Sequence, residues 1–451
     1  MTKKVTGLLL GMLVFCGIGY AQHEQCGSTE LMNAYIKAHP EAAEALAKYE
    51  AEIHVRTAEV EKQKTSSSQK TTDYLIPVPI VYHICLTQAQ IDEIGGTAGI
   101  AQRAQSQIDV LNRDFNGANT DTVPTIFQPL KGNAGFNFAM VHTNPSGHGT
   151  SGIEYRTLPV GYAGFSVGDW RLKSSSSDGL DPWNNQKYLN VWICDITTTG
   201  GGEVLGYAYS PKYASWVVGD PNQMGLAIDY KAFGKRQSAS DAYFTNSDRG
   251  RTMVHEMGHY FTLWHIWGNT TPGSGPLCSD DDSVSDTPVQ KDANQSLCPS
   301  YPKSNCNNNT GGEMFMNYMD YVTDFCMRMF SKGQVNRMQS EFRTGGGSYN
   351  LQFNGDLMGW PTGVSELEQK NSFDIIPNPS NGLINLAFNT DADVLHSVTI
   401  INSIGQTVKT IDNINNARKS ITVDLSNNPK GLYTVKCAFE SGLVTRNVVL
   451  Q

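Results

Sequence analysis

His255-Glu256-Met257-Gly258-His259 is the stretch from which the fold and chemistry of this chain can be predicted, with His265 following shortly after. Apolar side chains recur around it once per helical turn, at Met253, Met257 and Phe261. This period predicts an amphipathic helix over residues 251–263. Residues four apart in a helix lie one turn above each other, so the two imidazoles project from the same face.

The residue types in this stretch indicate a metal site. Two imidazoles one turn apart can bind a single zinc ion at about 2.0–2.1 Å, and Glu256 between them faces an open coordination position. His265 becomes the third ligand if the helix ends and the chain bends back. Two histidines at this spacing also occur by chance in unrelated chains, but the third histidine favours zinc.

This ligand set predicts hydrolysis of a peptide bond. Three neutral ligands leave zinc doubly charged, so that it can polarise a carbonyl and lower the pKa of a bound water to about 7. Glu256 is expected to take the proton of that water and pass it to the leaving amine. The competing hypothesis is a surface adhesin or binding protein with a non-catalytic zinc. A structural zinc is usually closed by four protein ligands and needs no base.

The composition predicts an exported globular protein of several domains. The chain has 451 residues, which is more than one hydrophobic core usually holds. Hydrophobic residues make up 39% and charged residues 17%, a balance typical of a globular protein. A net charge of −9 argues against nucleic acid as a partner. Lys3, Lys4, an apolar run and Gly19-Tyr20-Ala21 predict a signal peptide over residues 1–21. No later stretch is long and apolar enough for a transmembrane segment.

The part of the chain after the signal peptide changes character twice. Residues 22–71 are rich in Glu, Ala, Lys and Gln with helical spacing, which predicts a propeptide. Apolar residues then alternate from Ile76 onward and predict a strand, in which Pro77 and Pro79 require a free edge. Residues 72–343 combine such strands with helical segments, so we expect an α/β (α+β) catalytic domain.

A further change follows the catalytic region. Residues 344–371 begin with Thr344-Gly345-Gly346-Gly347-Ser348 and stay polar, as is typical of a flexible linker. Residues 372–451 contain about six short strands, separated by turns such as Asn378-Pro379-Ser380-Asn381-Gly382. We expect a small C-terminal β-sandwich there.

Residues 255–265 resemble the HExxHxxGxxH motif of metzincin metallopeptidases, and Asn317-Tyr318-Met319-Asp320-Tyr321 resembles their Met-turn. Within metzincins the chain is most similar to pappalysins, and among these to the bacterial, cytophagalysin-like members. The resemblance covers residues 72–343. It implies a metzincin catalytic domain with a twisted mixed sheet and a zinc-binding active-site helix, in a secreted endopeptidase that acts on protein or peptide substrates.

The resemblance also implies roles for two residues of the Met-turn. Met319 would form an apolar floor below the metal, and Tyr321 would hydrogen-bond the oxyanion. One position departs from the motif, because Thr262 stands where the family has glycine and the backbone must turn sharply. A β-branched residue disfavours positive φ. Either the chain makes the turn in another way, which we expect, or His265 is displaced and the metal site is weakened.

The loop between the helix and the Met-turn is expected to be braced and to bind calcium. The resemblance implies disulfides Cys278–Cys306 and Cys298–Cys326. It also implies a calcium ion, for which hard oxygen ligands are offered by Asp281, Asp282, Asp286 and Thr287. The competing interpretation of this loop is a solvated acidic turn.

Two residues outside the motif also gain roles from the resemblance. In basic-specific pappalysins, the position of Asp324 lies at the bottom of the pocket for the substrate residue just after the scissile bond, where a carboxylate would select Arg or Lys. The alternative is a surface aspartate. Cys26-Gly27 resembles a cysteine switch, in which a thiolate occupies the fourth zinc position of a zymogen. The alternative for Cys26 is a structural disulfide.

The C-terminal region resembles the sorting domains of the type IX secretion route, through Ile376-Pro377-Asn378-Pro379 and Gly431-Leu432-Tyr433. Such a domain carries no catalysis. The resemblance implies the type IX machinery as a partner and a secreted or cell-surface location. A carbohydrate-binding or adhesive β-sandwich is the alternative interpretation.

Overall fold

The computed structural model of the chain falls into two compact units, Met1–Trp360 and Pro361–Gln451. The predicted signal peptide, residues 1–21, and the predicted end of the propeptide at residue 71 lie outside the residues that the structure describes. It describes residues 26–66, 75–197, 204–268, 278–295, 298–304, 306, 311–359, 373–388, 395–402, 406–412, 414, 420–439 and 442–451.

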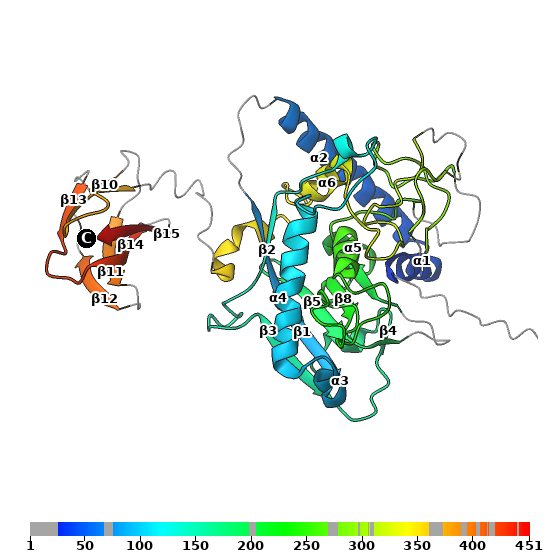
Figure 1. The fold of residues 1–451 in the computed structure, drawn as a ribbon, viewed down its shortest axis with the longest axis horizontal. Helices are drawn as coiled ribbons and strands as arrows, with labels where there is room; N and C mark the ends of the chain where they lie inside the picture. Colours follow the sequence, from blue (N-terminus) through cyan, green and yellow to red (C-terminus); the bar gives the residue numbers. More distant parts are fainter. Residues whose placement is uncertain are drawn as a thin grey trace, which may run out of the picture. The chain divides into compact units, whose positions relative to one another are not determined.

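A six-stranded mixed sheet forms the centre of the first unit (Figure 1). Its strands are β1 (Ile76–Thr87), β2 (Phe136–Met140), β3 (Ile153–Leu158), β5 (Leu189–Cys194), β7 (Gly206–Tyr209) and β8 (Gly225–Asp229). The order is β2, β1, β5, β8, β7, and β3 also pairs with β1. All pairs are parallel except β7 with β8, so the sheet ends in an antiparallel edge strand. Two short strands, β4 (Phe165–Ser166) and β6 (Ile196–Thr197), pair separately.

β1 is an interior strand of the sheet although it contains two prolines. It pairs with β2 from Ile76 to Ile80, and β5 joins its other side only from Ile80 onward. The Ile76 amide donates to Gly135 O, on the side of β2. The nitrogens of Pro77 and Pro79 therefore face the side where no strand is paired yet, which is the free edge that they require.

Helices cover the sheet, and two of them form most of the N-terminal segment, residues 26–66. They are α1 (Ser28–Ala38), α2 (Ala42–Ser66), α3 (Gln88–Glu93), α4 (Gly96–Phe115), α5 (Arg251–Tyr260) and α6 (Lys332–Ser340). Short helical turns are η1 (Gln128–Leu130), η2 (Trp170–Lys173), η3 (Tyr213–Val217) and η4 (Pro221–Gln223). α5 packs on β7, β8 and α4. In the parts of the chain that are described, no helix is long and apolar enough to cross a bilayer.

The N-terminal helix α2 docks on α6 of the catalytic region. Its buried side chains include Tyr49, Ile53 and Val60. Arg56 donates to Glu341 at 2.8 Å, and Arg337 donates to both carboxylate oxygens of Glu50 at 2.7 and 2.9 Å. Each buried charge has its partner, so removing one member of a pair would leave the other charge buried and unpaired, which is costly.

The predicted linker is wrong in its first part, because residues 344–359 belong to the first unit. They form the helical turns η5 (Leu351–Phe353) and η6 (Gly355–Met358). Leu351 and Met358 are buried, and Leu357 packs with Val81, Val141 and Tyr188. A few apolar side chains attach this polar segment to the first unit. Its overall polar composition therefore does not reveal that it is packed. Residues 360–371 lie outside the described part.

The second unit is the expected small β-sandwich. Its described strands are β9 (Phe373–Ile376), β10 (Leu383–Phe388), β11 (Leu395–Asn402), β12 (Thr407–Asp412), β13 (Ser420–Asp424), β14 (Gly431–Phe439) and β15 (Gly442–Leu450). They form two antiparallel sheets, β13-β10-β9 and β12-β11-β14-β15. Side chains from both sheets share one core, among them Leu386, Val398, Val435 and Val444.

Candidate metal centre and active site

The active-site helix α5 is shorter than predicted and ends in a tight turn at Thr262. The helix stops at Tyr260, and Thr262 has φ 73°, in the left-handed region. The Thr262 amide donates to His259 O and the Leu263 amide donates to Gly258 O, both at 2.9 Å, which is a Schellman motif. We expected the chain to turn here without the left-handed conformation of the family glycine, and this expectation is wrong. Thr262 itself adopts the left-handed conformation that glycine usually adopts at this position.

Three histidines converge beyond this turn. The Nε2 atom of His259 lies 3.1 Å from Nε2 of His255 and 3.1 Å from Nε2 of His265. The Nδ1 atoms of His255 and His259 lie 2.7 and 2.8 Å from the backbone oxygens of Tyr318 and Leu263. A carbonyl oxygen only accepts, so these two Nδ1 atoms carry the protons and leave the Nε2 lone pairs facing the centre.

This arrangement fits a zinc ion. The lone pairs of His255 and His259 converge in a buried site, where they repel each other unless a cation lies between them. Nitrogens of a tetrahedral zinc site stand about 3.3 Å apart, close to the spacing found here. Burial lowers the pKa of all three imidazoles, that of His259 to about 4, and so keeps them in the neutral form that binds metal.

Cys26 joins the histidines from the N-terminal segment. The ligand atoms of Cys26 and the three histidines all lie within 4.8 Å of one another, and no other group of three or more such ligands is found among the described residues. Cys26 is buried and free, so the alternative of a structural disulfide is wrong. Burial, together with the nearby Glu256 carboxylate, raises the pKa of its thiol.

Glu256 lies beside this cluster and is fully buried. Its Oε2 accepts a hydrogen bond from Ser28 Oγ at 3.0 Å and lies 3.5 Å from Cys26 Sγ. Burial raises its pKa to about 8. Gly206 of β7 leaves room for it, because a Cβ added there would lie 2.8 Å from Glu256 Cγ. The edge strand therefore packs against the methylene stem of Glu256.

The Met-turn residues lie below and beside the histidines. Met319 is fully buried, and its Sδ would lie 2.5 Å from a Cβ added at Gly258, so it packs tightly under α5. The Tyr321 ring meets His265 edge-on, with centroids 4.8 Å apart. Its hydroxyl donates to the backbone oxygen of Cys26 at 3.1 Å. Tyr321 thus reaches a peptide carbonyl held next to the metal cluster.

Asp324 lines a small pocket that also includes His255, Glu256, Val322 and Met327. It is only 3% exposed, so the alternative of a surface aspartate is wrong. Its Oδ2 accepts from the amides of Arg249 and Arg251 at 2.7 and 3.2 Å, where α5 begins. Burial raises its pKa to about 6. The same carboxylate therefore caps the active-site helix and lines the pocket.

The loop between the helix and the Met-turn contains the two implied disulfides, Cys278–Cys306 and Cys298–Cys326. The acidic side chains of this loop bind protein donors. Asp281 accepts from the Ser283 amide at 2.7 Å. Asp282 accepts from Thr287 Oγ1 at 2.6 Å, and Asp286 accepts from the Gly333 amide at 2.9 Å, near the start of α6. These carboxylates brace the loop in the structure.

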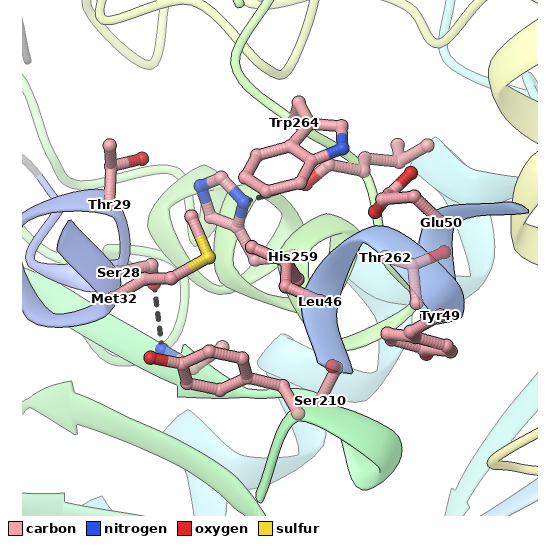
Figure 2. Close-up of a pocket in the computed structure, with 13 residues that line it drawn as sticks. Ser28, Thr29, Met32, Leu46, Tyr49, Glu50, Ser210, His259, Thr262 and Trp264 are labelled. Atoms are coloured by element: carbon pink, nitrogen blue, oxygen red, sulfur yellow. Dashed lines mark hydrogen bonds between the residues drawn. The ribbon is translucent and has the colours of Figure 1, made fainter. Parts of the chain in front are cut away.

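A pocket of about 60 Å³ lies between the N-terminal segment and the catalytic region. Figure 2 shows Met32, Leu46 and Tyr49 of α1 and α2 gathered with His259 and Trp264 around it. The N-terminal segment therefore fills one side of the histidine cluster.

Sequence patterns do not single out Ser28, Thr29 or Trp267, which complete the site. Trp267 stacks on His265, with ring centroids 4.4 Å apart. Ser28 Oγ accepts from the Ala208 amide of β7 at 2.9 Å, and Thr29 Oγ1 lies 3.0 Å from His265 Nδ1. For Ser28 and Thr29, the sequence signal that could have been used is their place directly after Cys26-Gly27. If Cys26 reaches the metal site, the next residues must lie beside the other groups of that site.

Fold and site together define a metzincin-type zinc metallopeptidase. Residues 176–343 match the family model described as pregnancy-associated plasma protein-A, and residues 374–451 match that of a secretion system C-terminal sorting domain. The chain belongs to the pregnancy-associated plasma protein-A family, the pappalysins. It is a secreted or cell-surface zinc metalloendopeptidase, so the alternative of a non-catalytic adhesin is not retained.

Curated relatives and solved structures agree with this assignment. An extracellular metalloprotease of Arthroderma benhamiae is 28% identical over 289 residues, covering 63% of this chain and 80% of the relative. A promirolysin variant of Tannerella forsythia is 32% identical, with a TM-score of 0.61, over 74% of this chain and 99% of that chain. Mature mirolysin with a cleaved peptide is 36% identical, with a TM-score of 0.55, over 63% and 98%. The predicted metzincin fold is confirmed.

Proposed function

We propose that the chain cuts peptide bonds with Glu256 as general base and general acid, around a zinc ion held by His255, His259 and His265. The observation that carries this proposal is that Nε2 of His259 lies 3.1 Å from Nε2 of both His255 and His265, beside a buried carboxylate. When bound, zinc supplies a doubly charged centre that polarises the peptide carbonyl and acidifies water. Glu256 takes the proton of the attacking water and passes it to the leaving amine.

Tyr321 is proposed to stabilise the oxyanion. Its hydroxyl already donates to the backbone oxygen of Cys26 at 3.1 Å, so it has the reach to serve a peptide carbonyl at this position. A fixed donor that strengthens as charge develops on the oxygen lowers the barrier without binding the substrate more tightly. Met319 supports the histidines from below by packing against Gly258.

The base is tested by comparing Glu256→Ala with His259→Ala in the full chain. We expect Glu256→Ala to fold and keep one zinc per chain but to lose cleavage by a factor of about 10² or more. His259→Ala should lose the zinc as well. Zinc content is measured by atomic absorption and cleavage with a fluorogenic peptide. A Glu256→Ala enzyme as active as the parent would show that the mechanism is wrong.

We further propose that the enzyme prefers Arg or Lys just after the scissile bond, through Asp324. The proposal is supported by the burial of Asp324 in the pocket beside His255 and Glu256. A cleavage profile on a peptide library tests it, with Asp324→Asn as the matched variant that keeps the size of the side chain. A profile with no basic preference in the parent would remove this proposal and leave helix capping as the role of Asp324.

We also propose that residues 22–71 are a propeptide and that Cys26 plugs the metal site. Two observations support the plug: Cys26 Sγ lies among the histidines, and the Gly27 amide donates to Gly206 O of β7 at 2.9 Å. The match to promirolysin also covers more of this chain than the match to mature mirolysin. A Cys26→Ala zymogen should hydrolyse a short peptide before it is processed, whereas equal latency in both zymogens would contradict the plug.

We retain a calcium site in the acidic loop, with Asp281, Asp282, Asp286 and Thr287 as ligands, as a proposal from the family resemblance. Burial raises the pKa of Asp282 to about 7, and a bound cation would oppose that shift. A calcium-selective chelator should then lower the unfolding temperature while zinc stays bound. An unchanged unfolding temperature would contradict the site.

A further inference from the structure

The three histidines differ in what orients them. His255 and His259 donate from Nδ1 to backbone oxygens of the catalytic region, those of Tyr318 and Leu263. The partner of His265 Nδ1 is different, because it is the hydroxyl oxygen of Thr29 in the N-terminal segment, at 3.0 Å. The third ligand is thus oriented by a residue that leaves if the propeptide is removed.

Other contacts of His265 fix the plane of its ring but not its direction within that plane. Trp267 stacks on one face with an interplanar angle of 10°, and Tyr321 meets the ring edge-on. Half a turn of the ring about its bond to Cβ keeps both contacts but points a carbon toward the other histidines. The hydrogen bond to Thr29 selects the orientation in which Nε2 faces them.

The surroundings make this hydrogen bond significant. His265 is fully buried and Thr29 is 2% exposed, so a proton on Nδ1 that lost its acceptor would stay away from water while the segment is docked. Among the described residues, Thr29 Oγ1 is the hydrogen-bond acceptor found for His265 Nδ1. The Thr29 hydroxyl therefore controls whether a buried group is satisfied.

We infer that Thr29 is a positioning residue of the metal centre, holding His265 in its ligating orientation as long as the propeptide is in place. The inference rests on the proposed zinc ligands. Its consequence is that the propeptide stabilises bound zinc in two independent ways, through the Cys26 thiolate and through Thr29. Residues that orient metal-binding histidines typically change metal affinity by about 10- to 100-fold.

The test uses full-chain zymogens carrying Glu256→Gln to prevent self-cleavage. Thr29→Val removes the hydroxyl and keeps the shape, while Thr29→Ser restores it. Thr57→Val is the matched control, because Thr57 is also in the N-terminal segment and its buried hydroxyl oxygen has no hydrogen-bond partner. Zinc transfer to a coloured chelator is timed, and the visible spectrum of the cobalt(II) form reports the ligand geometry.

We expect Thr29→Val to release zinc about tenfold faster and to change the cobalt spectrum, while Thr29→Ser and Thr57→Val behave like the parent. The effect should multiply with that of Cys26→Ala in the double variant. Protection of Cys26 from a thiol reagent verifies that the segment stays docked. If Thr29→Val exposes the thiol, the smaller Thr29→Ala takes its place.

Equal zinc release and equal spectra for Thr29→Val and Thr57→Val would overturn the inference. Failure of the proposed ligand set looks different, because the parent zymogen itself would then bind no zinc. An effect of Thr29→Val that vanishes when Cys26 is replaced would also overturn it, since the two contributions are inferred to be independent.

Discussion

At the scale of single residues, Thr262 combines a left-handed backbone, φ 73°, with a buried hydroxyl that has no hydrogen-bond partner. A residue with a Cβ adopts this conformation at a cost of roughly 1–2 kcal/mol, which glycine avoids. Glycine also gives the unfolded chain more conformational freedom, and this offsets part of the gain in stability. We expect Thr262→Gly to raise the free energy of unfolding by about 1 kcal/mol, measured by denaturant titration of the Glu256→Gln zymogen.

Thr262→Ala is the control for this prediction, because it keeps the Cβ and removes only the hydroxyl. The alanine variant should recover little of the stability if the backbone conformation is the main cost. A glycine variant less stable than the parent would show that the Thr262 side chain contributes more through its packing than its conformation costs.

Asp324 gives a pH-dependent prediction at the same scale. Burial raises its pKa to about 6, so the carboxyl is neutral below that pH and charged above it. The preference for a basic residue after the scissile bond should therefore be present at pH 8 and fall about tenfold by pH 5. The ratio of kcat/KM for lysine and norleucine peptides measures it. Asp324→Asn should give a flat ratio, and a flat ratio in the parent would contradict the role.

At the scale of elements, the docked helix α2 contributes a buried ion pair between Arg56 and Glu341. Arg56→Met leaves the Glu341 carboxylate buried without its cation, and breaking such a pair costs about 3–5 kcal/mol. We expect the zymogen to convert to the mature enzyme faster, as followed by gel electrophoresis over time. His54→Ala, at an exposed position of the same helix, is the control. Equal conversion rates would mean that α2 does not limit activation.

Elements with one clear period were predictable from the sequence. The spacing of Ile100, Ala104, Ile108 and Leu111 indicates α4, which buries this face, and the apolar period around His255 indicates α5, which is buried on nearly every side. The end of α5 was not predictable, since the positive φ of Thr262 contradicts the preference of threonine. Contacts distant in sequence also left no periodic signal, as between Ser28 and Glu256, 228 positions apart.

At the scale of the whole molecule, the end of the first unit can be tested by truncation. A chain that stops at Trp360 keeps the packing of Leu351, Leu357 and Met358, whereas a chain that stops at Arg343 loses it. We expect the longer form to unfold at the temperature of the catalytic unit in the full chain and the shorter form to unfold several degrees lower. Calorimetry measures both, and equal temperatures would show that residues 344–359 contribute nothing.

The architecture could be anticipated more fully than the site. Composition and turn signals sufficed for two units, because the second has its own core of alternating apolar residues. Segment 344–359 was misassigned because its few apolar residues pack on Val81 and Val141, far away in the chain. The same reason hides the polar contacts of the N-terminal segment, which only the folded chain brings to the histidines.

β7 ends the sheet of the first unit with one edge paired to β8. Its other edge meets the N-terminal segment through the oxygen of Gly206 and the amide of Ala208. If that segment is removed, as proposed, these backbone groups suit any extended chain, because they recognise peptide units whatever the side chains. A helix keeps its own amides and carbonyls occupied. We therefore expect this enzyme to cut most readily those proteins in which a segment unfolds easily, whatever their total content of arginine and lysine.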